Sequence, residues 1–209
     1  MKNLLLIGDS ICQGYNKSVK QTLQGKANVI CTNDSGRFAA YLLRILHECF
    51  EGVGRNEIDV LHWNAGLWDC LCLFGEEPHT PIDVYAYYID RICQRIKKKF
   101  PNAKVIFATS TRVLSEQMHP NFKRLNEDIE RYNAVAVEIV ERYGFEVDDL
   151  YAVSAALPDE AHSDATHYYT PLGTEAFTNA VLAAVLPALD IVEPLTYREE
   201  MYTDQPHGI

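Results

Sequence analysis

The chain has 209 residues, a length that suits one well-filled α/β domain. Its formal net charge of −10 argues against a nucleic-acid backbone or an anionic membrane surface as the main partner. No repeat, low-complexity run or flexible linker interrupts the chain. We therefore predict one domain over residues 1–189, with residues 190–209 as an acidic extension of that domain, whereas the sequence does not indicate the oligomeric state.

The cysteines lie in apolar segments and lack the paired spacing of a zinc site. We expect them to be reduced, largely buried side chains. The apolar run after residue 3 is too short for a signal peptide, and no cleavage site follows it. These features predict a cytoplasmic protein, and the six thiols concerned are Cys12, Cys31, Cys49, Cys70, Cys72 and Cys93.

The first apolar run, Leu4 to Ile7, stops abruptly at Gly8-Asp9-Ser10. Four consecutive apolar residues are typical of a central parallel strand that is buried on both faces. Ser10 would then lie just past the carboxyl end of this strand, where open α/β sheets bind ligands. Two interpretations stay open at this point, because Asp9-Ser10 could simply cap a following helix.

Further apolar runs alternate with helical patterns along the rest of the chain. A loop leads into a weak helix over residues 13–23, and residues 70–80 are expected to form a loop. The order of elements favours a three-layer α/β/α sandwich, flavodoxin-like, with a parallel sheet of about five strands. The expected strands are 27–31, 58–63, 103–108 and 145–147, and the expected helices are 38–46, 81–99, 122–143, 149–151 and 171–189.

Each expected strand end delivers a small or polar residue to one edge of the sheet, namely Ser10, Gly36, Asn64 and Thr109. A strand followed by a glycine loop and a helix also presents backbone N–H groups at the helix start. Such N–H groups suit an anion, including a transient oxyanion.

The loop at residues 162–168 adds a possible base and carboxylate. Asp164 and His167 are three residues apart, so one turn can bring their side chains together. A histidine oriented by a carboxylate can activate a serine hydroxyl, which predicts a triad of Ser10, His167 and Asp164. Alternatively, Asp164 could be a turn residue and His167 a packed loop histidine. A metal site that includes His162 matches no standard spacing, so we expect neither metal nor cofactor.

The combined motifs resemble those of the GDSL, or SGNH, hydrolase family over about residues 1–189. The motifs that carry the resemblance are Ile7-Gly8-Asp9-Ser10, Ser35-Gly36, Asn64-Ala65-Gly66 and Asp164-Ala165-Thr166-His167. The resemblance implies a flavodoxin-like catalytic domain that hydrolyses esters or thioesters without a metal. It also implies Ser10 as nucleophile, His167 as base and Asp164 as its orienting group. The oxyanion donors would be the backbone N–H groups of Ser10 and Gly36 and an asparagine side chain.

One motif departs from the family pattern, which usually reads Gly-x-Asn-Asp after the third strand. This chain has Asn64 in the usual glycine place and Gly66 in the usual asparagine place. The third oxyanion donor is therefore either the Asn64 amide or the Gly66 N–H. We favour Asn64, because a side chain can reach across a turn to the developing charge.

The sequence says less about the substrate. Trp68 and Tyr168, with Tyr15 and Phe74, could form an aromatic wall for a sugar ring or a short acyl chain, or could pack in the core. Asp9 is a further candidate substrate contact, and Arg112 could bind a substrate anion or form an ion pair.

We predict a serine esterase for small acyl esters, for example acetyl groups on carbohydrates. The alternatives are a lysophospholipase or thioesterase of the same family, and a carbohydrate-binding module without catalysis in which Ser10 is only a cap. A receiver-type protein that uses Asp9 is the least favoured alternative.

Overall fold

The structure is a computed structural model that describes residues 1–32, 34–47 and 57–198. Its strands are β1 (Lys2–Ile7), β2 (Ala27–Cys31), β3 (Val60–Trp63), β4 (Cys72–Leu73), β5 (Lys104–Ala108), β6 (Phe122–Lys123) and β7 (Glu146–Asp148). The α-helices are α1 (Ser10–Thr22), α2 (Ala39–Ile45), α3 (Ile82–Lys99), α4 (Asn126–Arg142), α5 (Leu150–Ala156) and α6 (Pro171–Ala188), and two 3₁₀ helices span Ser115–Gln117 and Asp159–Ala161.

Five strands form one parallel sheet in the order β2-β1-β3-β5-β7. This is the flavodoxin-like order, in which the chain starts near the middle of the sheet and winds outward in both directions. The residues from Leu4 to Ile7 in β1 are each no more than 1% exposed, so the predicted strand is indeed buried on both faces. The predicted fold class is therefore confirmed.

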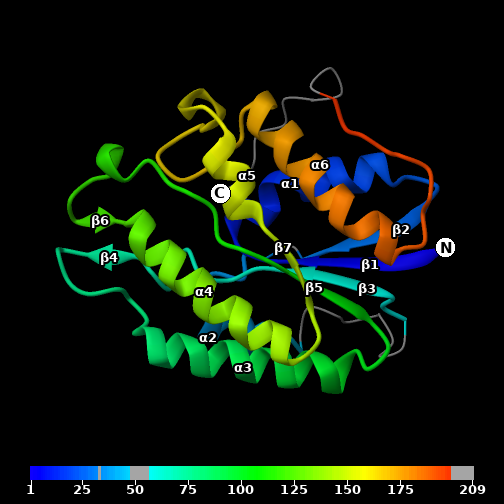
Figure 1. Ribbon diagram of the computed structural model, residues 1–209, viewed down its shortest axis with the longest axis horizontal. Coiled ribbons are helices and arrows are strands. Elements are labelled where there is room, and N and C mark those ends of the chain that lie inside the picture. Colours follow the sequence, from blue (N-terminus) through cyan, green and yellow to red (C-terminus); the bar gives the residue numbers. More distant parts are fainter. Residues whose placement is uncertain (33, 48–56, 199–209) are drawn as a thin grey trace.

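Helices cover both faces of the sheet and make the three layers (Figure 1). α1 packs against α6, and α5 also contacts α6, on one face. α3 packs between α2 and α4 on the other face. The buried stripe of α3, at Tyr85, Ile89, Ile92 and Ile96, has the spacing of an amphipathic helix and explains why this helix lies flat on the core.

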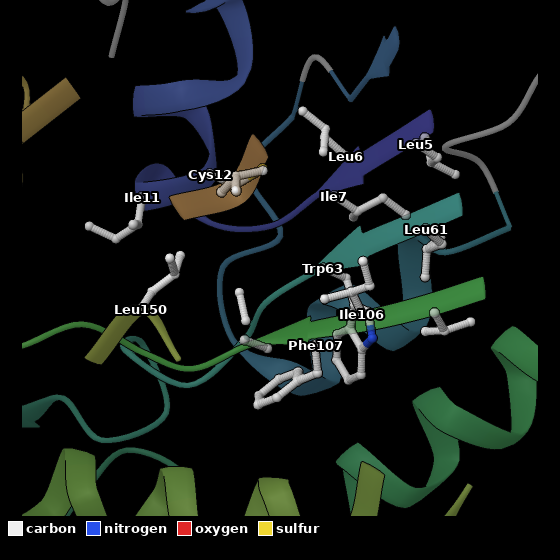
Figure 2. Close-up of a cluster of buried hydrophobic side chains, with 14 of the residues drawn as sticks. Leu5, Leu6, Ile7, Ile11, Cys12, Leu61, Trp63, Ile106, Phe107 and Leu150 are labelled. Atoms are coloured by element: carbon white, nitrogen blue, oxygen red, sulfur yellow. The ribbon is translucent and has the colours of Figure 1, made fainter. Parts of the chain in front are cut away.

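The hydrophobic core follows the strands (Figure 2). Trp63 and Phe107 are register partners on β3 and β5, and their rings meet edge to face with centroids 4.8 Å apart. Trp63 therefore fills the core, as its position in an apolar run predicts. The five described cysteines are free thiols, either buried or half-buried, and Cys49 lies outside the described residues.

The structure differs from the expected elements at two places that matter for the site. α1 begins directly at Ser10, without a preceding loop. The expected helix over 122–143 begins only at Asn126, because residues 122–123 form β6 and pair antiparallel with β4 inside the expected loop 70–80. Tertiary pairing thus overrides the helical pattern there, and the Asn126 side chain binds the backbone N–H and C=O of Val113 at 2.9 Å each.

The segment after α6 runs back over the domain as far as it is described. Tyr197 is buried, and its backbone exchanges two hydrogen bonds with the Asn179 side chain, at 2.8 and 2.9 Å. Asp190 forms an ion pair with Lys2 at the start of β1. None of the described helices is both long and apolar enough to cross a bilayer.

Candidate active site

The turn between β1 and α1 places Asp9 and Ser10 at the carboxyl edge of the sheet. Asp9 is the N-cap of α1, and its side chain accepts a hydrogen bond of 2.9 Å from the Ile11 N–H. Ser10 is the first residue of the helix, so its hydroxyl stays free of the cap. The two interpretations of Asp9-Ser10 are thus compatible, because the cap and the candidate nucleophile are different residues.

The predicted role of Asp9 as a substrate contact is wrong in this structure. Asp9 has an exposed fraction of 0% and lies beneath the turn. Burial raises the pKa of its carboxyl, an effect opposed by the Asn64 side chain, the Ile11 N–H and the charges of His167 and Arg124. Asp9 therefore supports the Ser10 turn from within the protein.

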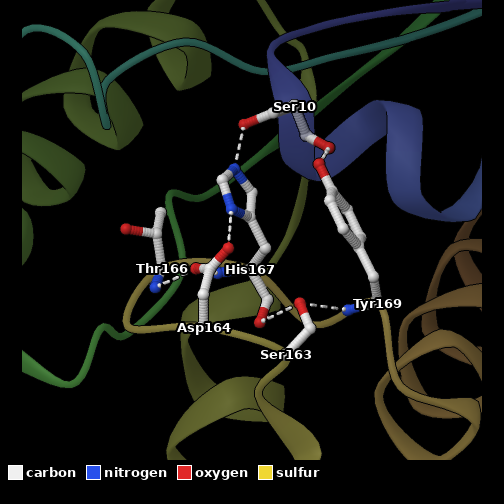
Figure 3. Close-up of polar contacts among 6 residues, drawn as sticks. All are labelled: Ser10, Ser163, Asp164, Thr166, His167 and Tyr169. Carbon is white, nitrogen blue, oxygen red and sulfur yellow. Dashed lines mark hydrogen bonds and ion pairs between the residues drawn. The ribbon is translucent and has the colours of Figure 1, made fainter. Parts of the chain in front are cut away.

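The loop from His162 to Tyr169 brings the predicted histidine and carboxylate to Ser10 (Figure 3). The Asp164 Oδ1 atom accepts hydrogen bonds from the backbone N–H groups of Thr166 and His167, at 2.7 and 2.8 Å. Ser163 closes the same loop, since its N–H donates to the His167 carbonyl oxygen at 2.7 Å. Asp164 and His167 thus lie in one compact turn, whose backbone N–H groups hold the Asp164 carboxylate in place.

Ser10, His167 and Asp164 form one chain of hydrogen bonds. The His167 Nε2 atom lies 2.8 Å from the Ser10 Oγ atom, and its Nδ1 atom lies 2.7 Å from the Asp164 Oδ2 atom. Partial burial alone would raise the pKa of Asp164, but hydrogen bonds from the His167 ring, Thr166 and the His167 backbone lower the pKa below its ordinary value. Asp164 is therefore held as a carboxylate that orients the imidazole.

Tyr169 also belongs to this site, although it is not among the predicted site residues. Its ring stacks on the His167 ring, with centroids 4.8 Å apart and an angle of 19° between the planes. Its hydroxyl donates a hydrogen bond of 2.8 Å to the Ser10 carbonyl oxygen (Figure 3). Tyr169 thus braces the histidine against the first turn of α1.

The predicted role of Tyr168 as a substrate contact is wrong, because its side chain points into the core. It is 3% exposed and packs against His162 and Phe177. Its hydroxyl donates to the Arg112 carbonyl oxygen at 2.8 Å. Two adjacent tyrosines directly after His167 indicate that one of them packs on the histidine. A loop has no periodicity, however, so the sequence does not tell which of the two rings faces the site.

Of the four predicted oxyanion donors, Ser10 and Gly36 differ in what their N–H groups contact. The Ser10 N–H, at the start of α1, donates to no acceptor within the described chain. The Gly36 N–H donates instead to the Gly8 carbonyl oxygen at 2.6 Å. The Gly36 loop is thus fastened to the turn that carries Ser10, and its N–H is engaged.

Asn64 and Gly66 lie in the loop after β3. Asn64 is buried, and its Oδ1 atom approaches Gly8 so closely that a Cβ there would lie only 1.7 Å away. Gly66 has φ +151 and faces Ser110, whose Oγ atom would lie 2.4 Å from a Cβ at Gly66. Asn64 thus packs tightly against the end of β1, and Gly66 packs tightly against the end of β5.

Asp69 is a second buried carboxylate, and it is not among the predicted site residues. Both of its oxygens accept from the Ala39 N–H, at 3.2 and 3.0 Å, so it caps α2 from a distance. α2 follows the Gly36 loop, and its own N-cap residue, Phe38, makes no side-chain cap. Asp69 therefore joins the Gly36 loop to the Asn64 loop.

Burial raises the pKa of Asp69 from 3.8 to about 7, against the hydrogen bonds from Ala39 and Thr80. The folded state then binds a proton that the unfolded state has released, so stability is lost as pH rises from about 4 through about 7. Between pH 5 and pH 8 we expect wild-type protein to lose about 2–3 kcal/mol relative to Asp69→Asn, which keeps an acceptor but no charge. Urea unfolding of both proteins across this pH range measures the difference, and parallel pH profiles would contradict it.

Three further residues were considered as substrate or metal contacts, namely Trp68, Arg112 and His162. Trp68 is half-buried in the Asn64 loop, and its substrate contact stays a prediction. Arg112 is ion-paired with Asp159 at 2.6 Å, beside a cavity of about 380 Å³ lined by residues 112–117, 125–127 and 159. The His162 ring packs on the Tyr168 ring at an angle of 37°, and no cluster of three His, Cys, Asp or Glu residues suited to a metal occurs in the described ranges.

Comparison with known proteins shows similarity in structure alone. No family model matches the chain, and no curated protein matches its sequence. An acetyl xylan esterase is similar with a TM-score of 0.69 and 17% identity, over 88% of this chain and 99% of that chain. A putative acylhydrolase from Bacteroides fragilis has a TM-score of 0.70 and 17% identity, over 90% and 88% of the two chains. A GDSL-like lipase from Bacteroides thetaiotaomicron has a TM-score of 0.69 and 16% identity, over 90% and 89%. The chain therefore has the fold of these solved structures, which is the fold that its resemblance to the GDSL family implies.

Proposed function

We propose that this protein is a serine esterase that hydrolyses small acyl esters. The observation that carries the proposal is the hydrogen-bonded chain from Ser10 through His167 to Asp164 at the carboxyl edge of the sheet. A hydroxyl within hydrogen-bond distance of an imidazole that a carboxylate orients is the arrangement that activates a serine. A binding module would need no such chain.

The reaction proceeds through an acyl-enzyme. Ser10 Oγ attacks the ester carbonyl carbon while His167 Nε2 accepts the hydroxyl proton, and Asp164 stabilises the resulting imidazolium. His167 then protonates the leaving alcohol as the ester C–O bond breaks. Water, deprotonated by His167, attacks the acyl group, and the carboxylic acid leaves as the proton returns to Ser10.

The tetrahedral oxyanion needs hydrogen-bond donors close to Ser10. The Ser10 N–H is the first donor, because it lies at a helix start and has no acceptor in the described chain. The Asn64 amide, which packs on Gly8 and interacts with Asp9, is the second. The Gly36 N–H would contribute only after its bond to the Gly8 carbonyl oxygen opens.

A small acyl group, such as acetyl on a carbohydrate, is the favoured substrate. Two observations support this choice. Solved structures of the same fold include acetyl xylan esterases, one of them from Geobacillus stearothermophilus, with 19% identity and a TM-score of 0.68. The Tyr169 ring, which contacts Ser10, and the half-buried Trp68 of the Asn64 loop are aromatic side chains that suit a sugar ring.

A fluorophosphonate probe together with an ester panel tests the proposal. We expect covalent labelling at Ser10, located by mass spectrometry, and turnover of p-nitrophenyl acetate that falls as the acyl chain lengthens. A preference for long acyl chains or for thioesters would favour the lysophospholipase or thioesterase alternative. Absence of both labelling and turnover would favour a binding module.

A further inference from the structure

Arg124 is a buried cation beside the proposed site to which no role has been assigned. It directly follows β6, it is 3% exposed, and its Nε atom donates to the Leu67 carbonyl oxygen. Leu67 belongs to the loop that starts at Asn64, whose N–H donates to the Ile7 carbonyl oxygen at 3.2 Å. The guanidinium therefore lies against the loop that adjoins the Ser10 turn.

Two aromatic rings orient this guanidinium. Its central carbon lies 5.3 Å from the ring centroid of Phe122 and 6.0 Å from that of Trp68. Phe122 is 45% exposed and Trp68 is half-buried, so the cluster extends from the interior to the surface. Rings that flank a guanidinium favour its charged form and hold its planar fork of donors in one direction.

The charge of Arg124 has no carboxylate partner within ion-pair distance among the described residues. Arg112 and Arg131, by contrast, pair with Asp159 and Asp128 at 2.6 and 3.1 Å. The two Nη nitrogens of Arg124 donate to no described acceptor, and they are absent from the fully buried polar atoms without a partner, so they are not completely buried. A largely buried cation whose donors are free is costly to keep, unless a ligand supplies the acceptor.

The charge of Arg124 interacts electrostatically with Asp164 of the proposed triad and with Asp9, the residue before Ser10. Burial lowers the pKa of Arg124, and the carboxylates of Asp9 and Asp164 are among the groups that oppose this shift. Asp9 and Asp69 are buried carboxyls with raised pKa values, which reduces the negative charge that could compensate the arginine. The donors of Arg124 therefore remain available for an anion that approaches Ser10.

We propose that Arg124, which lies near the rings of Trp68 and Phe122, binds an anionic oxygen group of the substrate, so that the preferred ester carries a carboxylate close to the scissile bond. A guanidinium fork matches a carboxylate with two parallel hydrogen bonds. The carboxylate can belong to the acyl part, as in a half ester of a dicarboxylic acid, or to the alcohol part, as in an acetylated acidic sugar. This inference rests on the proposed esterase function and specifies its substrate class.

Paired substrates test the inference, because each pair differs only in charge. Mono-p-nitrophenyl succinate is compared with p-nitrophenyl butyrate, and the acetylated methyl glycoside of glucuronic acid, with its carboxylate free, is compared with acetylated methyl glucoside. We expect wild-type protein to prefer the charged member of at least one pair. Arg124→Gln should lower kcat/KM for that member by about 10- to 100-fold, mainly through KM, and change the neutral member less than about threefold. Arg124→Lys should recover part of the loss, and Arg131→Gln, a surface control, should change neither member.

A binding measurement separates this inference from the proposed function. Titration calorimetry with the acetylated methyl glycoside of glucuronic acid and with mono-p-nitrophenyl succinate on Ser10→Ala protein should show binding of at least one of them that Arg124→Gln removes. If no ester is hydrolysed but this binding depends on Arg124, the esterase proposal fails and the anion site stands. The inference would be overturned if Arg124→Gln lowered kcat/KM equally for charged and neutral substrates, or if binding were the same with and without Arg124. Arg124 would then only support the Leu67 backbone. Thermal melting of each variant verifies that it is folded.

Discussion

Ser10→Ala protein is expected to retain its fold and to lose ester hydrolysis by about 10⁴-fold or more. The Oγ atom forms a hydrogen bond with His167, and it takes no part in capping α1, which Asp9 performs. Its removal therefore costs little stability, but no acyl-enzyme can form. The measurement is kcat/KM for p-nitrophenyl acetate together with fluorophosphonate labelling, which should disappear.

Ser115→Ala is a suitable control, because the Ser115 Oγ atom is buried without a hydrogen-bond partner in the described chain. Its activity should equal that of the wild type. Undiminished turnover by Ser10→Ala, with labelling on another residue, would contradict the proposed mechanism.

Gly8→Ala should both destabilise the protein and impair catalysis. A Cβ at Gly8 would lie 1.7 Å from the Asn64 Oδ1 atom and 2.7 Å from the Cys12 Cβ atom, in a turn whose carbonyl also accepts from the Gly36 N–H. Overpacking of this kind typically costs about 1–3 kcal/mol or more. Relief of the clash must shift Asn64 or the turn, and a displacement of about 1 Å at a nucleophile can cost about 10²-fold in rate.

Gly25→Ala separates packing from backbone strain. Gly25 has φ +75, but a Cβ there would meet nothing within 4 Å. We expect this variant to lose about 1 kcal/mol from the left-handed conformation alone and to keep full activity. Urea unfolding and kcat/KM of the two variants provide the comparison, and a Gly8→Ala protein as stable and active as Gly25→Ala would contradict the packing argument.

Sequence patterns were sufficient to predict the parallel sheet and the meeting of Ser10, Asp164 and His167. The run from Leu4 to Ile7 is apolar at every position, and only a strand covered on both faces buries such a run. Parallel strands in turn direct their carboxyl ends to one edge, so Ser10 and the loop with Asp164 and His167 were expected to meet. The distances of 2.7 and 2.8 Å then join these three residues in the structure.

Sequence patterns did not predict the direction of side chains within a loop or the pairing of short strands that are far apart in the chain. Tyr168 and Tyr169 are chemically alike, yet one packs in the core and the other on His167, because the turn around Asp164 sets their directions. β4 and β6 are two residues each, and their pairing across a long sequence separation leaves no local periodicity.

By itself, then, the sequence determined the fold class and the family resemblance, and it predicted that Ser10, Asp164 and His167 meet, because hydrophobic runs and short motifs are local properties of the chain. Only the tertiary structure decided which side chains are buried beneath the site and which face it. Asp9 and Asp69 became internal supports, the Gly36 N–H was bound by Gly8, and Arg124 was brought beside Leu67. These outcomes depend on contacts between segments that are distant in the chain, and no pattern within one segment encodes such contacts.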